Sequence, residues 1–217
     1  MQTLTVTDYN ELRKDSQVIE ADGFGDKVLR LRDGNFLKLF RRKRLLTSDL
    51  LKSYSHRFVD NARELIKLGV PTVEVLVVYK IPSIERTAVC YRPLAGEPLR
   101  SWLTSCGTLE KQQLARDLGR FVARLHLSGV YFRSLHLGNI LMMPDGRLGL
   151  IDVADMRCKG HSLSFSSRLR NFRHMTRYRD DMQLLGASTA ILAETYNDMA
   201  RTSKGFRLKL ETILSGL

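Results

Sequence analysis

Apolar and polar residues alternate with period two along much of residues 1–92, which is the pattern of β-strands with one buried face. The alternation is clearest in residues 27–32 and 35–40, which are joined by Asp33-Gly34, a dipeptide that favours a hairpin turn. Three further strands are predicted, at residues 17–21, 73–81 and 87–91. The first part of the chain therefore predicts an antiparallel sheet.

The spacing of apolar residues changes to three or four in residues 48–68, which predicts one helix in this sheet-rich part. A second helix is predicted over residues 109–127, and the rest of the chain is mainly helical in pattern. A Pro/Gly cluster at residues 93–98 marks a boundary between the two parts. We therefore expect an α+β protein with two lobes, residues 1–92 with the sheet and one helix, and residues 93–217, mainly helical.

Composition is that of a soluble globular protein, because 43% of the residues are apolar and 27% are charged. No apolar run reaches the roughly 20 residues that span a bilayer, and the N-terminus has no signal-type apolar core. The three cysteines are scattered and form no Cys-x-x-Cys pair, which argues against a disulfide framework and a zinc site; they are Cys90, Cys106 and Cys158. We therefore expect a cytoplasmic protein.

The net charge of +12 is the one unusual bulk property. A basic surface attracts phosphates of nucleotides, nucleic acid, lipid headgroups or phosphorylated saccharides, and does not choose among them. The charge is concentrated in Arg41-Arg42-Lys43-Arg44 and in a second group made of Arg168, Arg170, Arg173, Arg177 and Arg179. For any single one of these residues, a solvated surface position is the simpler interpretation. Few aromatic residues accompany them, which argues against a nucleic-acid partner.

A loop and a strand end carry the most specific chemical pattern in the chain. The loop reads Tyr131-Phe-Arg-Ser-Leu-His-Leu-Gly-Asn139, and Asp152 follows Asn139 by thirteen residues at the end of an apolar strand. Between them, Asp145-Gly146 favours a hairpin turn. The pattern resembles the catalytic loop and metal-binding hairpin of the small atypical kinases. This resemblance implies that Asn139 and Asp152 are Mg²⁺ ligands, since both offer hard oxygen donors.

Lys38 lies in the middle of the predicted strand 35–40, which is a poor place for an unpaired charge. In a kinase-like site it would reach the α- and β-phosphates of ATP, whereas alone it would be an ordinary lysine on the exposed face of a strand. Gly23 and Gly25 precede it by one hairpin, as a turn that covers a nucleotide requires. Taken with the loop, these residues predict an ATP site in the sheet-rich lobe.

Two positions depart from the kinase pattern. Ser134 stands five residues before Asn139, where the catalytic aspartate is expected, and a serine hydroxyl does not accept a proton at neutral pH as a carboxylate does. Asn61 stands where a helix glutamate would pair with Lys38, and Glu64 is the alternative partner on nearly the same helix face.

The loop residues that the resemblance places at the catalytic centre are Arg133, Ser134 and His136. Without the aspartate, His136 or Asp155 would have to orient the acceptor, although a histidine in such a loop is more often structural. General-base catalysis contributes about 10²–10⁴-fold, and phosphoryl transfer needs little deprotonation of the acceptor. A slow kinase and an inactive relative are therefore both compatible with Ser134.

The segments around the loop are most similar to the bacterial lipopolysaccharide kinase group, which includes the heptose kinases and small proteins named for toluene tolerance. The similarity covers residues 20–185 and includes Asn61-Ala-x-x-Leu-x-x-Leu-Gly-Val-Pro-Thr72 and Leu150-Ile-Asp-x-x-x-Met-Arg157. It implies ATP and Mg²⁺ as cofactors and a sugar hydroxyl of the lipopolysaccharide core, or another anionic glycolipid precursor, as acceptor. It also implies a peripheral position at the cytoplasmic face of the inner membrane.

Three functions are compatible with these residues. The first is a small kinase that phosphorylates a sugar of the lipopolysaccharide core. The second is a pseudokinase that binds nucleotide and regulates envelope assembly, which Ser134 and the absence of a glutamate at position 61 favour. The third is a nucleic-acid-associated kinase of the tRNA-modification type, which the shortage of aromatic residues in the basic stretches disfavours.

Overall fold

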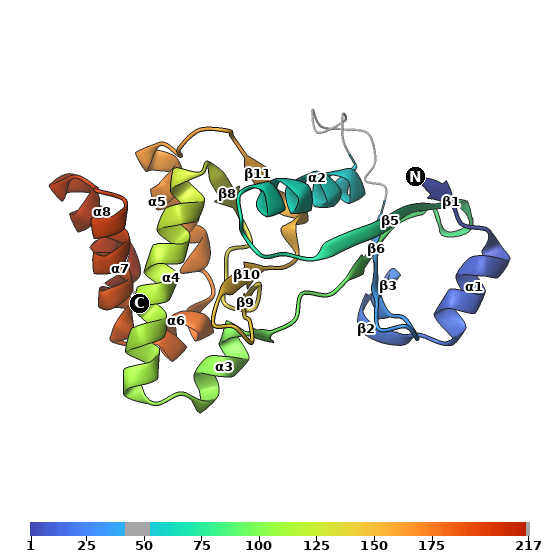
Figure 1. Cartoon of the computed structure of the whole chain (residues 1–217), viewed down its shortest axis with the longest axis horizontal. Coiled ribbons are helices and arrows are strands. Elements are labelled where there is room, and N and C mark those ends of the chain that lie inside the picture. Colours follow the sequence, from blue (N-terminus) through green and yellow to red (C-terminus); the bar gives the residue numbers. More distant parts are fainter. Residues whose placement is uncertain (42–52, 216–217) are drawn as a thin grey trace.

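The computed structural model describes residues 1–41 and 53–215. A six-stranded sheet lies at one end of the molecule and most helices lie at the other (Figure 1). In spatial order the strands are β1 (Gln2–Thr3), β5 (Glu74–Ile81), β6 (Arg86–Arg92), β4 (Phe36–Arg41), β3 (Gly25–Arg30) and β2 (Gln17–Asp22). Neighbouring strands are antiparallel, except that β1 and β5 are parallel. The predicted α+β fold with an antiparallel N-terminal sheet is confirmed.

The predicted hairpin between β3 and β4 forms because its sequence satisfies both the strands and the turn. Leu29, Leu37 and Leu39 are buried on one face of the two strands, as the alternation requires. Gly34 has φ +84°, a backbone conformation that glycine adopts without steric cost. Lys38 therefore sits opposite Val28 in the ladder, with its side chain on the other face from these leucines.

The sheet-rich part contains a helix that the apolar pattern did not predict, α1 (Val6–Lys14). Only one of its side chains, Tyr9, is buried, so its apolar spacing is weak. Its sequence signal is a capping box, in which the Thr5 side chain accepts from the Asp8 amide and Asp8 accepts from the Thr5 amide. The expectation of one helix in residues 1–92 was therefore wrong.

The predicted helix over residues 48–68 corresponds to α2 (Tyr54–Lys67), capped by Ser53. Residues 48–52, the start of the predicted helix, and the basic residues 42–44 lie outside the described residues. The helix buries Phe58, Ala62 and Leu65 in the main core, where Phe58 packs against Phe40 of β4 and Tyr91 of β6. A short 3-10 turn, Pro82–Ile84, joins β5 to β6.

The helical part begins with β7 (Glu97–Pro98) and α3 (Leu99–Ser105) and is built around α4 (Thr108–Leu127). The remaining helices are α5 (Phe165–Met175), α6 (Arg179–Leu185), α7 (Ser188–Met199) and α8 (Lys204–Ser215). Gly119 lets α7 approach α4 closely, because a Cβ there would lie 2.7 Å from the Leu192 carbonyl oxygen. The predicted helical C-terminal part is thus confirmed, whereas the division into lobes at residues 92 and 93 stays a prediction.

Two small sheets position the loop that carries the chemical pattern. In the first, β10 (Leu148–Leu150) pairs with β9 (Ile140–Met142), which also pairs with β7. In the second, β11 (Met156–Cys158) pairs with β8 (Val130–Phe132). A short 3-10 turn, η2 (Val153–Asp155), connects β10 to β11. The loop after β8 and the turn before β11 therefore lie next to each other.

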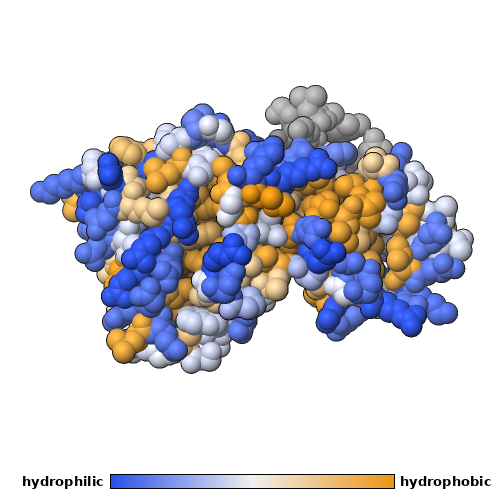
Figure 2. Space-filling view, viewed as in Figure 1, coloured by the Kyte–Doolittle hydropathy of each residue, from blue (hydrophilic) through white to orange (hydrophobic). Residues whose placement is uncertain are grey.

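The described helices include none that is long and apolar enough to cross a membrane. The surface seen in Figure 2 carries an apolar area over β5. The cysteines Cys90, Cys106 and Cys158 are free, as their spacing predicts.

Candidate functional site

A cavity of about 690 Å³ opens between the sheet and the turn η2. Its volume lies within the range of small-molecule sites, roughly 300–1,000 Å³. It contains Lys38, Ser134 and Asp152, three residues that the sequence pattern singled out, and Asp155. The other described residues that line it are Glu20, Asp22, Lys27, Leu39, Phe40, Arg41, Tyr54, Arg86 and Ala154.

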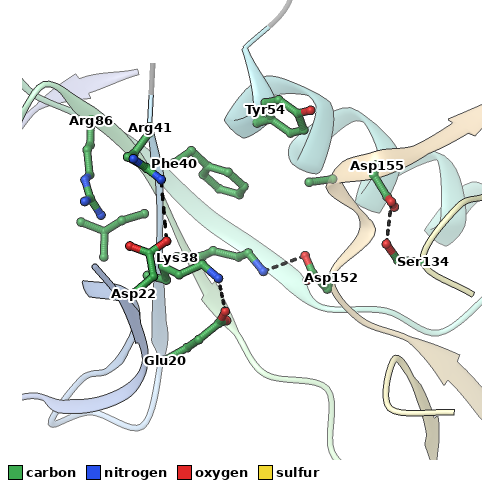
Figure 3. A pocket seen from close by; sticks show the side chains of 13 residues that line it. Glu20, Asp22, Lys38, Phe40, Arg41, Tyr54, Arg86, Ser134, Asp152 and Asp155 are labelled. Carbon is green, nitrogen blue, oxygen red and sulfur yellow. Dashed lines mark hydrogen bonds and ion pairs between the residues drawn. The ribbon is translucent and has the colours of Figure 1, made fainter. Parts of the chain in front are cut away.

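Lys38 and Asp152 meet inside this cavity, although 114 positions separate them in the chain. The Lys38 ammonium donates to Asp152 Oδ1 at 2.6 Å, and the two side chains point toward each other (Figure 3). The Lys38 side chain is 16% exposed, while that of Asp152 is 44% exposed. The fold thus presents a cation and a carboxylate together to one solvent-filled space.

Asp152 is held in a strained backbone conformation. Its φ is +55° and its ψ is +46°, the left-handed region that non-glycine residues seldom occupy. Such strain persists only where the surrounding structure over-determines it, and it concentrates at functional sites. The surrounding structure here includes Asn61 of α2, whose amide donates to the carbonyls of Val153 (2.7 Å) and Met156 (2.9 Å).

The expected pairing of Lys38 with a side chain of α2 is not found. Asn61 is buried and donates to the backbone that follows Asp152, which directs it away from Lys38. Glu64 lies one turn further on and pairs with Lys67 at 2.6 Å on the exposed face of the helix. Within residues 1–41 and 53–215, the ion pair of Lys38 is the one with Asp152.

The loop that carries Asn139 is fixed mainly by buried hydrogen bonds. Asn139 is buried, and its amide donates to the Ser134 carbonyl at 3.0 Å. The carboxylate of Asp181, fully buried on α6, accepts from the Leu137 amide at 2.8 Å and from Arg100 at 2.5 Å. Sequence reasoning missed Asp181, because its partners are 44 and 81 residues away and no local pattern marks it.

His136 has contacts of a structural residue. Its Nδ1 accepts from the Gly138 amide at 3.1 Å, and its ring packs on Tyr178 with centroids 4.2 Å apart. Burial lowers the pKa of this imidazole. His126 is fully buried between Tyr196 and Asn171, as expected of a core residue. Arg133, the remaining loop residue of the predicted catalytic set, is exposed.

The turn between β2 and β3 holds Gly23 and Gly25, and neither glycine is among the described residues that line the cavity. Gly25 has φ +104°, which glycine alone adopts readily. Arg86 of β6 donates to the carbonyls of Phe24 and Asp26 and so holds the turn over the sheet. Sequence reasoning missed Arg86, whose buried position depends on this long-range contact.

The acidic residues of the cavity differ in how they are neutralised. Glu20 pairs with Lys27, Asp22 with Arg41 at 3.7 Å, and Asp152 with Lys38. Asp155 instead accepts a hydrogen bond from the Ser134 hydroxyl at 2.5 Å. Figure 3 shows Asp152, Ser134 and Asp155 on the same side of the cavity.

The donor set fits a magnesium–nucleotide complex better than an ion enclosed by protein. Among residues 1–41 and 53–215, no three His, Cys, Asp or Glu side chains converge to hold a metal. Mg²⁺ in nucleotide sites is bound by one or two carboxylates and by phosphates and waters. The exposed Asp152 carboxylate beside a lysine offers such a partial site, and Asn139 lies in the adjoining loop.

Only some of the arginines in the basic stretch after β11 are exposed on the surface. Arg168 was expected there, but it is buried and donates to the Leu163 carbonyl at 2.9 Å and the Ser162 hydroxyl at 2.7 Å. An arginine in this place fixes the start of α5 and cannot contact a partner. The exposed members are Arg170, Arg173, Arg177 and Arg179.

Known proteins supply two kinds of comparison. No curated protein sequence matches the chain. One similar solved structure is described as "A divergent kinase lacking the glycine-rich loop regulates membrane ultrastructure of the Toxoplasma parasitophorous vacuole", with 22% identity, a TM-score of 0.45, and coverage of 84% of this chain and 67% of that chain. Another is WbdD in complex with a kinase inhibitor, with 14% identity, a TM-score of 0.48, and coverage of 89% of this chain but 42% of that chain.

The model of one protein family matches residues 11–196, which include strands β2 to β6 of the sheet, the loop and the residues that line the cavity. The family is described as the lipopolysaccharide kinase (Kdo/WaaP) family, and its fold is the kinase-like arrangement described above. The resemblance seen in the loop sequence is therefore confirmed. This chain belongs to the lipopolysaccharide kinase (Kdo/WaaP) family.

Proposed function

We propose that this protein binds Mg-ATP in the cavity of Lys38 and Asp152 and phosphorylates a sugar hydroxyl of the lipopolysaccharide core. The observation that carries the proposal is the 2.6 Å pair between these two residues in a 690 Å³ cavity. Family membership supplies the reaction class, since the family is one of lipopolysaccharide kinases.

The roles of the residues follow from their charge and position. Lys38 binds phosphate oxygens, and Asp152, aided by the amide oxygen of Asn139, holds Mg²⁺. Bound Mg²⁺ neutralises charge on the phosphates, which is the main requirement of phosphoryl transfer. Since Lys38 and Asp152 pair with each other at 2.6 Å, nucleotide binding exchanges this ion pair for contacts with phosphate and metal. A nucleotide-covering role for the turn of Gly23 and Gly25, held by Arg86, stays a prediction, because neither glycine is among the described residues that line the cavity.

Thermal unfolding tests the nucleotide site. A ligand that binds the folded state stabilises it by RT ln(1+[L]/Kd), about 2.7 kcal/mol at a hundred times Kd. Mg-ATP should therefore raise Tm, while ATP with EDTA should raise it much less. Lys38→Met should abolish the effect, and Lys67→Met, which alters an exposed lysine of α2, should not. No shift at about 10 mM Mg-ATP, well above usual KM values, would rule the site out.

The acceptor is an anionic glycolipid precursor. This part of the proposal rests on the family and on the exposed arginines at 170, 173, 177 and 179, which suit phosphate or carboxylate groups. It places the protein at the cytoplasmic face of the inner membrane as a peripheral protein. Cell fractionation tests this location, because salt should release the protein from membranes if charge holds it there.

A second candidate is a nucleotide-binding pseudokinase with a regulatory role in envelope assembly. The serine at position 134, in place of the catalytic aspartate, favours it. Both candidates predict stabilisation by Mg-ATP, and only the kinase transfers phosphate. Transfer to purified core saccharide therefore separates them.

A further inference from the structure

The Ser134 hydroxyl lies in the cavity and donates to Oδ2 of Asp155 at 2.5 Å, within the range of strong hydrogen bonds between a hydroxyl and a carboxylate (Figure 3). Ser134 occupies the sequence position at which the kinase pattern leads us to expect a catalytic aspartate. A carboxylate is therefore present next to this position. It belongs to Asp155 of the turn η2 and contacts the loop through the Ser134 hydroxyl.

The fold brings the two residues together through the pairing of β8 and β11. These strands run antiparallel with Phe132 opposite Met156. Ser134 follows Phe132 by two residues and Asp155 precedes Met156 by one, so the two side chains face each other across the end of the ladder. Asn61 fixes the same turn from the other side, because it binds the carbonyls at both of its ends.

Asp155 has unused hydrogen-bonding capacity. Its Oδ1 is buried and has no hydrogen-bond partner among the described residues. The other three carboxylates of the cavity are paired with cations, whereas Asp155 has only the Ser134 hydroxyl. Buried carboxylate oxygens without a partner are rare in folded proteins, and a catalytic role is one of the explanations for them, beside a bound water or ion. Among the described residues of the cavity, Asp155 is thus the carboxylate that no cation neutralises and that contacts the Ser134 hydroxyl.

We propose that Ser134 and Asp155 act together as a proton relay in place of the missing aspartate. In this relay Ser134 contacts the acceptor hydroxyl, and Asp155 receives the proton. The inference rests on the proposed kinase function and specifies how the acceptor is activated. Under this proposal, the serine takes part directly in proton transfer.

The acceptor oxygen bonds to the transferred phosphorus while the bond from that phosphorus to its leaving oxygen breaks, and the electron pair departs with the nucleoside diphosphate. The acceptor's proton passes to Ser134 Oγ as the serine's own proton passes to Asp155 Oδ2. Asp155 returns to its ionised form by losing the proton to solvent.

His136 is the other candidate for this role, and its contacts exclude it. Its Nδ1 accepts from the Gly138 amide, and its ring packs on Tyr178. It is not among the described residues that line the cavity. The relay therefore depends on the oxygen pair of Ser134 and Asp155.

Four variants test the relay, with ADP formation from Mg-ATP measured with purified core saccharide and with water as acceptor. Asp155→Asn and Ser134→Ala should lower kcat by about 10²–10⁴-fold with little change in the KM for ATP. Ser134→Thr keeps the hydroxyl and should stay within about tenfold of wild type. Ser134→Asp with Asp155→Asn moves the carboxylate to the loop and should regain at least about tenfold over Asp155→Asn alone.

Stabilisation by Mg-ATP, measured for every variant, shows that each one is folded and binds nucleotide. Asp117→Asn is the matched control, because it changes an exposed aspartate that pairs with Arg120 on α4. It should leave kcat unchanged. If Asp155→Asn fails to fold, Asp155→Glu retains the carboxylate and should keep measurable turnover.

The outcomes separate the relay from the proposed function. Wild-type protein without Mg-ATP stabilisation would refute the nucleotide site itself. Stabilisation with wild-type kcat in Asp155→Asn would refute the relay alone. The relay is also wrong if the double variant Ser134→Asp with Asp155→Asn has no higher kcat than Asp155→Asn alone. It is likewise wrong if the wild-type protein binds Mg-ATP and forms no ADP.

Discussion

Asn61 donates a hydrogen bond of 2.7 Å from its side-chain amide to the carbonyl oxygen of Val153, the residue that follows Asp152. A second bond, of 2.9 Å, reaches the carbonyl of Met156. The helix α2 therefore contributes a clamp on the turn that carries Asp152 and Asp155, and it contributes no carboxylate partner for Lys38. A change at this helix should act on the stability and shape of the turn.

Replacing Asn61 with leucine should lower the free energy of unfolding by about 2–4 kcal/mol, because two buried carbonyls lose their donors. Asn61→Asp should be at least as damaging, since a carboxylate would face the same carbonyl oxygens. Chemical denaturation measures both. Asn10→Leu, at an exposed position of α1, is the control and should change stability little. An equal effect at both sites would contradict the clamp.

Asp181 should anchor the loop between β8 and β9. Asp181→Asn weakens the charged hydrogen bonds to Leu137 and Arg100, and we expect a loss of about 1.5–3 kcal/mol in unfolding free energy. Hydrogen exchange should show faster exchange of the Leu137 amide. Asp180→Asn, on the exposed neighbour, should cost about 0.3–1 kcal/mol through the helix terminus alone. Unchanged protection of Leu137 would argue against the anchor.

His126 should make stability depend on pH in a defined range. Burial lowers its pKa from 6.5 to about 3, so the folded protein keeps the imidazole neutral while the unfolded chain protonates it. Between these values the unfolded state binds more protons, and stability falls as pH falls, by up to about 1.4 kcal/mol per pH unit. The loss should begin near pH 6.5.

Urea denaturation at several pH values from about 7 to 4 measures this slope. His126→Gln keeps a hydrogen-bonding side chain and removes the titration. Its stability will be lower at neutral pH, but its dependence on pH in this window should be flatter than that of wild type. Parallel curves for the two proteins would show that other groups cause the acid sensitivity.

Five of the six strands of the sheet could be predicted from sequence because local signals determine them, whereas the two-residue strand β1 and its parallel pairing with β5 were not predicted. Alternation and the Asp33-Gly34 turn located β3 and β4 to within two residues. The helix α1 was missed because it buries a single side chain, and its capping box was the better signal. Apolar periodicity reveals a helix or strand only when that element buries enough apolar side chains to produce a regular spacing.

The site could be predicted in part. The spacing around Asn139 and Asp152 identified the loop and hairpin, and Lys38 and Asp152 do line one cavity. The direction in which a side chain of α2 points depends on how the helix packs, so the sequence left the partner of Lys38 open between Asn61 and Glu64, and in the structure these two residues contact the backbone after Asp152 and Lys67. The pairing of Ser134 with Asp155 depends on the register of β8 and β11, which no local pattern reports.

Transfer of phosphate from γ-labelled ATP to purified lipopolysaccharide core saccharide tests the central claim most directly. Wild-type protein should label the saccharide in the presence of Mg²⁺, and Asp152→Asn should reduce labelling to background because the carboxylate beside Lys38 is lost. The control Asp117→Asn should label as wild type does. Binding of Mg-ATP without labelling of the saccharide would contradict the claim.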